Sequence, residues 1–136
     1  MTKVLADLVV ARAAARCEYC LLPASISPIP FHIEHIVARI HGGETNEANL
    51  AYACMRCNCH KGTNLGTVDA LTQQHTRLFN PRHDRWREHF TLAGHSIVGL
   101  TQVGRATVQL LRMNDLPRQA LRAEAIRQRI WVMPVT

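Results

Sequence analysis

The sequence predicts an α+β protein that forms a single domain over residues 1–136. Segments with the apolar spacing of helices are mixed with short segments typical of strands, a pattern that favours small sheets covered by helices. Of the 136 residues, 47% are hydrophobic, enough for one buried core and too few for two. Only 5% are aromatic, so we expect an aliphatic core.

The cysteines predict a structural zinc site. Two Cys-x-x-Cys pairs, Cys17/Cys20 and Cys54/Cys57, each present two sulfurs from one side of a short turn, and one Zn²⁺ bound by both turns closes a tetrahedral site. The total of five cysteines is odd, which argues against disulfides. We expect the fifth, Cys59, to lie outside the site because Cys57 already completes the second pair.

The helices and strands expected before residue 66 are short. One cysteine turn follows the first helix, and the other follows the second strand. In order, we expect an amphipathic helix over 4–15, a strand over 31–37, a second strand over 50–54, and a helix that begins at 57 or 58 and ends at 62 or 66. Gly42-Gly43 predicts the turn between the strands. Neighbouring side chains of a strand point to opposite faces, so His32 and Glu34 share one face and His35 lies on the other.

The remainder, about 67–136, is predicted to be an extension made of a hairpin and helices. Residues 67–87 have no readable period, whereas 88–91 and 96–100 flank a turn at Gly94 and predict a β-hairpin. Thr101 is a suitable N-cap for a helix that ends at Asn114. Asp115 and Pro117 then start a last helix, which carries the apolar residues Leu116, Ala120, Ala123, Ile126 and Ile130.

The basic charge of the chain by itself indicates a solvated surface, and it favours a polyanionic partner only in combination with a nucleic-acid-binding motif. The formal charge is +6, and ten arginines but only five carboxylates follow residue 64. Arginines recur at helical spacing, which predicts basic stripes able to contact a phosphate backbone. One stripe is Arg105 and Arg112, and the other, on the last helix, is Arg118, Arg122 and Arg129. A merely solvated basic surface remains the alternative for each of them.

Ordered motifs over about residues 17–62 resemble the HNH endonucleases in their cysteine-knuckle form. The matching residues are Cys17-x-x-Cys20, Glu34-His35-Ile36, Arg39, Gly42-Gly43, Asn49-Leu50, Cys54-x-x-Cys57-Asn58 and Lys61-Gly62. The resemblance implies a ββα-metal nuclease core over about residues 17–66.

Within this resemblance each motif residue takes a role. His35 would be the general base that deprotonates the attacking water, and Asn49 would brace the loop that orients it. Glu34, where the family usually has Asp or His, and Asn58 would hold a catalytic cation; a carboxylate and an amide oxygen suit Mg²⁺ or Mn²⁺. We expect Arg39, Arg56 and Lys61 to contact nucleic acid beside the site.

The expected function is therefore hydrolysis of phosphodiester bonds, with DNA as the substrate and RNA left open. Two alternatives remain: a catalytically silent zinc module that binds nucleic acid, and a zinc-stapled adaptor for protein partners. No apolar run reaches the ~20 residues of a membrane span, and the first residues lack an export pattern, so we expect a cytoplasmic protein without a membrane partner. The sequence leaves monomer and homodimer open.

Overall fold

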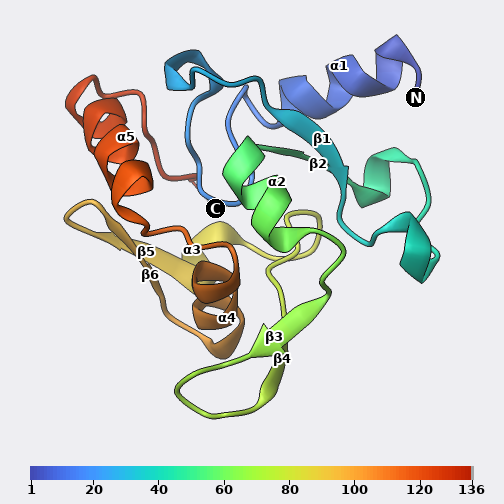
Figure 1. Cartoon of the computed structure of the whole chain (residues 1–136). Coiled ribbons are helices and arrows are strands. Elements are labelled where there is room, and N and C mark those ends of the chain that lie inside the picture. The colour runs from blue at the N-terminus through green and yellow to red at the C-terminus, as the bar shows by residue number, and fades with distance from the viewer. Residues whose placement is uncertain (136) are drawn as a thin grey trace.

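The computed structural model of the chain describes residues 1–135 and confirms an α+β fold (Figure 1). Its helices are α1 Lys3–Arg12, α2 Met55–Lys61, α3 Trp86–His89, α4 Gln102–Leu110 and α5 Leu116–Arg127, and single 3-10 turns are η1 Ala24–Ile26, η2 Arg39–His41 and η3 Glu47–Asn49. Its strands form antiparallel pairs: β1 His32–His35 with β2 Leu50–Ala53, β3 Gly66–Val68 with β4 His75–Arg77, and β5 Phe90–Ala93 with β6 Ser96–Gly99. No helix among residues 1–135 is long and apolar enough to cross a membrane.

The first helix forms as predicted but is shorter than residues 4–15. The Thr2 side chain accepts a hydrogen bond from the Leu5 amide and caps the N-terminus of α1. Only Val9 is fully buried, whereas Val4 is 79% exposed. The apolar stripe is therefore only partly covered, because α1 touches the β1–β2 hairpin along one edge.

The unit β1–β2–α2 places the candidate catalytic residues. His35 pairs with Leu50 across the hairpin, and the Ile36 amide donates to the Asn49 carbonyl at 2.9 Å. Helix α2 begins two residues before the predicted start, because the Cys54 sulfur accepts from the Cys57 amide and acts as the N-cap. In Figure 1, α2 lies in front of the β1–β2 hairpin.

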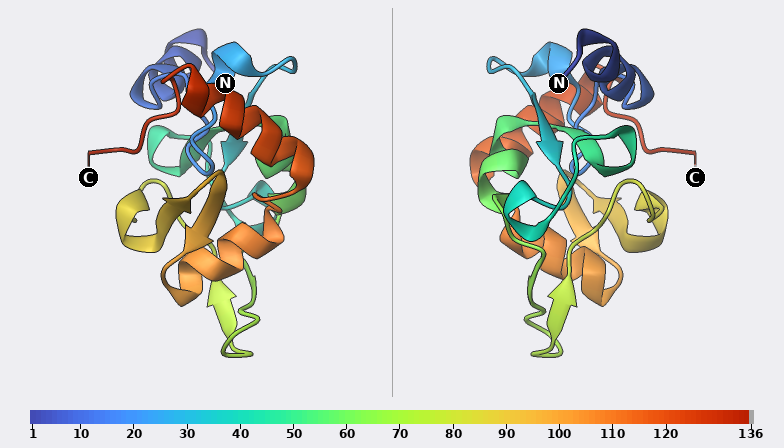
Figure 2. Two further views of the ribbon diagram at one scale, coloured as in Figure 1. Left: turned by 90° about the vertical axis from the view of Figure 1, so that its left-hand side faces the viewer. Right: turned by 90° about the vertical axis from the view of Figure 1, so that its right-hand side faces the viewer.

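The extension contains one hairpin more than predicted. The β3–β4 hairpin lies at the opposite end of the molecule from α1 (Figures 1 and 2). It is tied to α4 by Asp69, which accepts two hydrogen bonds of 3.0 Å from Arg105. Thr101 caps α4 as predicted, but α4 ends at Leu110. Asn114 instead exchanges hydrogen bonds of 2.9 and 2.8 Å with the Ile97 backbone on β6.

The apolar pattern of α5 describes its buried face only in part, since Ile126 packs against the hydrophobic core. Leu116 is 80% exposed, and the buried residues of the helix are Arg118, Arg122 and Ala125. The arginines face inward because the surface under α5 offers sulfurs and free carbonyl oxygens. Arg122 donates to the carbonyls of Met113 at 2.5 Å and His95 at 2.7 Å.

The core is shared by both halves of the chain and is aromatic at its centre, contrary to the expected aliphatic core. Trp86 packs against Phe90, with ring centroids 5.0 Å apart, and edge-on against Trp131 at 6.0 Å. The indole of Trp86 donates to the Tyr19 carbonyl at 2.8 Å, and that of Trp131 to the Cys20 carbonyl at 3.1 Å. The first cysteine turn thus rests directly on the extension.

Candidate functional site

The four paired cysteines form a buried metal-binding cluster. Their sulfurs all lie within 4.8 Å of one another, and the Cys20 and Cys54 sulfurs are 3.7 Å apart. Tetrahedral coordination at the usual Zn–S distance of about 2.3 Å requires sulfurs about 3.8 Å apart, so this donor set fits a closed structural zinc site. Cys59 is exposed and outside the cluster, as expected.

Arg118 contacts this cluster from α5. Its guanidinium donates to the Cys57 sulfur at 2.8 Å and to the Cys54 sulfur at 3.6 Å, and it also reaches the Leu111 carbonyl. Burial alone would lower the pKa of Arg118, but the nearby sulfurs, above all Cys57, raise it above the usual value. The predicted contact of Arg118 with nucleic acid is therefore wrong, since the side chain is buried and serves the cysteine cluster.

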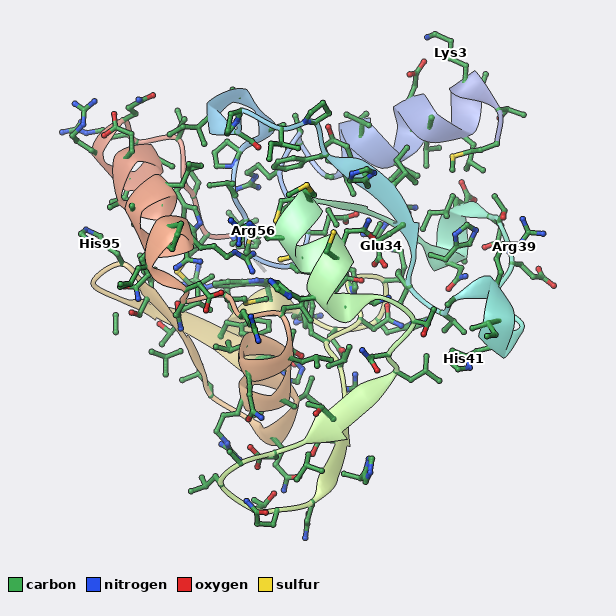
Figure 3. All side chains as sticks on the ribbon, in the orientation of Figure 1. Lys3, Glu34, Arg39, His41, Arg56 and His95 are labelled. Atoms are coloured by element: carbon green, nitrogen blue, oxygen red, sulfur yellow. The ribbon has the colours of Figure 1, made fainter. Side chains whose placement is uncertain are left out.

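Glu34 is buried between the hairpin and α2 (Figure 3). One carboxylate oxygen accepts from the Tyr19 hydroxyl, and the other from the Lys61 ammonium at 2.9 Å. Lys61 is only 2% exposed and also donates to the His35 carbonyl at 3.1 Å. Burial raises the pKa of Glu34 although Lys61 and Tyr19 lower it.

These contacts correct two expectations from the sequence. Glu34 does not fit as a cation ligand in this geometry, because both of its oxygens are engaged and an ammonium already neutralises its charge. Lys61 is buried and cannot contact a phosphate backbone. Asn58, the other predicted ligand, is half-buried on α2, one turn before Lys61.

His35 lies at the end of β1 with its ring held in place. Its Nε2 is 2.8 Å from the Thr45 hydroxyl, and the residue is half-buried. Asn49 accepts from the Val37 amide and donates to the carbonyls of Val37 and Glu44, all at 2.9 Å. Asn49 thus ties the loop that carries Thr45 to the residues directly after β1.

The tight course of this loop requires a glycine. A Cβ at Gly43 would lie 1.7 Å from the Val37 carbonyl oxygen, so any larger residue would push the loop away from β1. The glycine pair predicted the turn but not the contact of Thr45 with His35. Tyr19 was also missed; its place between two cysteine ligands was the available signal.

The predicted nucleic-acid contacts do not form one surface. Arg39 on η2 and Arg56 on α2 are exposed, but they lie on opposite sides of α2 in Figure 3. Arg105 is paired with Asp69. The predicted role of Arg122 is wrong because it is 2% exposed and bonded to backbone carbonyls.

Comparison with known proteins identifies the region that holds both the cysteine cluster and His35. Residues 17–64 match a family model described as HNH endonuclease. No curated protein and no solved structure matches the chain.

Proposed function

We propose that the protein hydrolyses phosphodiester bonds in DNA, with His35 as the general base. The match of residues 17–64 to the HNH endonucleases supports this class of reaction. The observation that carries the proposal is the positioning of His35. Its ring is held by Thr45, on a loop that Asn49 fixes to the end of β1. A catalytic base needs such a fixed orientation towards the water that it deprotonates.

The proposed reaction uses the free nitrogen of His35. Since Nε2 is engaged by Thr45, Nδ1 takes a proton from water. The resulting hydroxide attacks phosphorus, the bond from phosphorus to the 3′ oxygen breaks, and that oxygen takes a proton from solvent water. The products carry a 5′-phosphate and a 3′-hydroxyl. His35 is half-buried, so the residue retains some contact with solvent.

The proposal includes a structural Zn²⁺ at Cys17, Cys20, Cys54 and Cys57 and a catalytic Mg²⁺ or Mn²⁺. A divalent cation would neutralise charge at the scissile phosphate. Asn58 is the proposed protein ligand, whereas Glu34 would serve only after releasing Lys61. A cytoplasmic location suits the zinc site, because thiols stay reduced there.

A second candidate function is favoured by one observation. Glu34 is neutralised by Lys61 rather than open to a cation, as expected for a silent zinc module that binds nucleic acid without cutting it. Cleavage assays separate the two functions directly.

The test compares His35→Ala with His32→Ala on supercoiled plasmid, in buffer with Mg²⁺, Mn²⁺ or no added metal. His32 is exposed three residues away on β1, so its loss should leave cleavage intact. Loss of a positioned base should slow cutting by about 10²- to 10⁴-fold. Zinc content and DNA affinity should stay unchanged in both variants.

Two outcomes would contradict parts of this proposal. Cutting by His35→Ala at the wild-type rate would remove His35 as the base. A wild-type protein that binds DNA but cuts it in none of the metal conditions would establish the silent module instead.

A further inference from the structure

A cleft of about 310 Å³ opens beside the first cysteine turn, on a surface that the proposed reaction does not use. Its walls come from the end of α1, from the turn itself and from the segment that leads into α3. Four arginines line it: Arg12, Arg16, Arg82 and Arg85. Arg12 and Arg85 are exposed at its rim, and Trp86 is buried below it.

The cleft carries more positive than negative charge. It contains two carboxylates, Glu18 and Asp84. Glu18 pairs with Arg82 and also accepts from the Tyr52 amide at 2.8 Å. Asp84 accepts two hydrogen bonds, of 2.6 and 2.9 Å, from Arg77 outside the cleft.

Three arginines of the cleft are left without an acidic partner. Among residues 1–135, no ion pair includes Arg12, Arg16 or Arg85. Arg12 and Arg16 donate only to backbone carbonyls, those of Leu50 and Val132. Partial burial and then repulsion from Arg82 lower the pKa of Arg12, although Glu18 and Glu47 raise it. The fold therefore holds like charges together, and an anion in the cleft would relieve their repulsion.

The cleft adjoins the strand that pairs with His35. Arg12 and Arg82 both donate to the Leu50 carbonyl, at 2.6 and 3.3 Å. Leu50 pairs with His35 across the hairpin, so the arginines occupy the outer edge of β2. The cleft therefore lies close to the strand pair that carries His35.

We propose that this arginine cleft binds phosphates of the nucleic-acid backbone near the bond cut at His35. Guanidinium groups pair with phosphate oxygens through two parallel hydrogen bonds. The inference rests on the proposed function for its substrate, and it replaces Arg118 and Arg122 as the source of backbone affinity.

The test measures DNA binding without cleavage. In a His35→Ala background, duplex affinity is followed by fluorescence anisotropy over a series of salt concentrations. The variant Arg12→Gln/Arg85→Gln should bind more weakly and flatten the plot of log K against log salt by about 0.9 for each phosphate that is no longer neutralised. Arg127→Gln/Arg129→Gln removes the same charge at exposed positions, one at the last residue of α5 and one just beyond it, and should keep the wild-type slope.

A single variant and a competition with inorganic phosphate separate the possible explanations of a change in binding. Arg85→Gln alone, at an exposed position, should give part of the effect with unchanged zinc content and tryptophan emission. Equal slopes for both double variants would overturn the cleft assignment while leaving the plasmid result for His35 untouched. Inorganic phosphate is added at constant ionic strength; displacement of the duplex by micromolar phosphate would overturn the proposal in favour of a small-anion site.

Discussion

For single residues, the sequence motif predicted chemical roles, and the contacts in the folded protein support some of these roles and contradict others. Glu34 and His35 are neighbours in the sequence, but Glu34 is bonded to Tyr19 and Lys61 while His35 is bonded to Thr45. The pair Glu34-His35 could be recognised from the sequence because the two residues are consecutive in the chain. It could not predict Lys61 as the partner, since a lysine near an active site is ordinarily assigned to the surface.

The buried pair of Lys61 and Glu34 leads to a stability prediction. Lys61→Met should lower the free energy of unfolding by about 3–5 kcal/mol, because it leaves a buried carboxylate without its counter-charge. Lys3→Met breaks the exposed pair with Asp7 and should change stability by less than about 0.5 kcal/mol. Urea unfolding in the presence of zinc measures both variants.

The pH dependence of the free energy of unfolding tests whether the charge of Glu34 causes this loss of stability. Burial raises the pKa of Glu34 in the folded state above its unfolded value of about 4.3. The ionised carboxylate therefore costs stability, and the cost sets in as pH rises from the unfolded pKa through the folded one. The loss of unfolding free energy in Lys61→Met should become larger as pH rises. It should largely disappear in the double variant Glu34→Gln/Lys61→Met. A loss that is constant with pH would point to packing instead.

At the scale of elements, the periodic patterns predicted which segments fold but not always which face is buried. Both strands of the β1–β2 hairpin and the cap of α4 were predicted from alternation and from Thr101. Helix α5 was predicted from its apolar residues, yet Arg118 and Arg122 occupy the buried positions at the same helical spacing. Apolar periodicity fails at these two positions because sulfurs and carbonyl oxygens lie beneath them, whereas Ala125 and Ile126 of the same helix pack on the hydrophobic core.

Arg118 connects α5 to the zinc site, and its loss should weaken metal retention. Arg118→Met removes the donor to Cys57 and Cys54, so excess negative charge on the thiolates is no longer offset. Loss of such an outer contact typically costs about 10- to 100-fold in metal affinity. Transfer of zinc to a coloured chelator should be faster by a similar factor.

Two further variants test this explanation of zinc retention. Arg127→Met lies on the exposed side of the same helix and should release zinc like the wild type. Arg118→Lys keeps the positive charge but loses the planar guanidinium group with its several donors. Its rate of zinc release should lie between those of Arg118→Met and Arg127→Met. Equal release from Arg118→Met and Arg127→Met would show that the contact does not stabilise the metal site.

At the scale of the whole molecule, the main contacts join parts of the chain that no local pattern relates. Trp86 reaches the Tyr19 carbonyl and Trp131 reaches the Cys20 carbonyl, across 67 and 111 residues of sequence. The few aromatic residues are concentrated at this junction, which composition alone could not reveal. The predicted boundary between core and extension, near residue 66, is therefore no break in the hydrophobic core.

We predict that removing zinc unfolds the nuclease core and the extension together. Zinc binding at four-cysteine or similar sites supplies about 10–16 kcal/mol, whereas a domain of this size is stable by only about 5–15 kcal/mol. Both tryptophans lie against the first cysteine turn, so their emission should shift to longer wavelength as a chelator is added. The far-UV circular dichroism signal should fall at the same chelator concentration, because α4 and α5 rest on the same core. Trp86→Phe leaves Trp131 as the reporter from the C-terminal segment and should show the same midpoint. A tryptophan transition that precedes most of the loss of helical signal would mean that residues 67–135 fold as a separate domain.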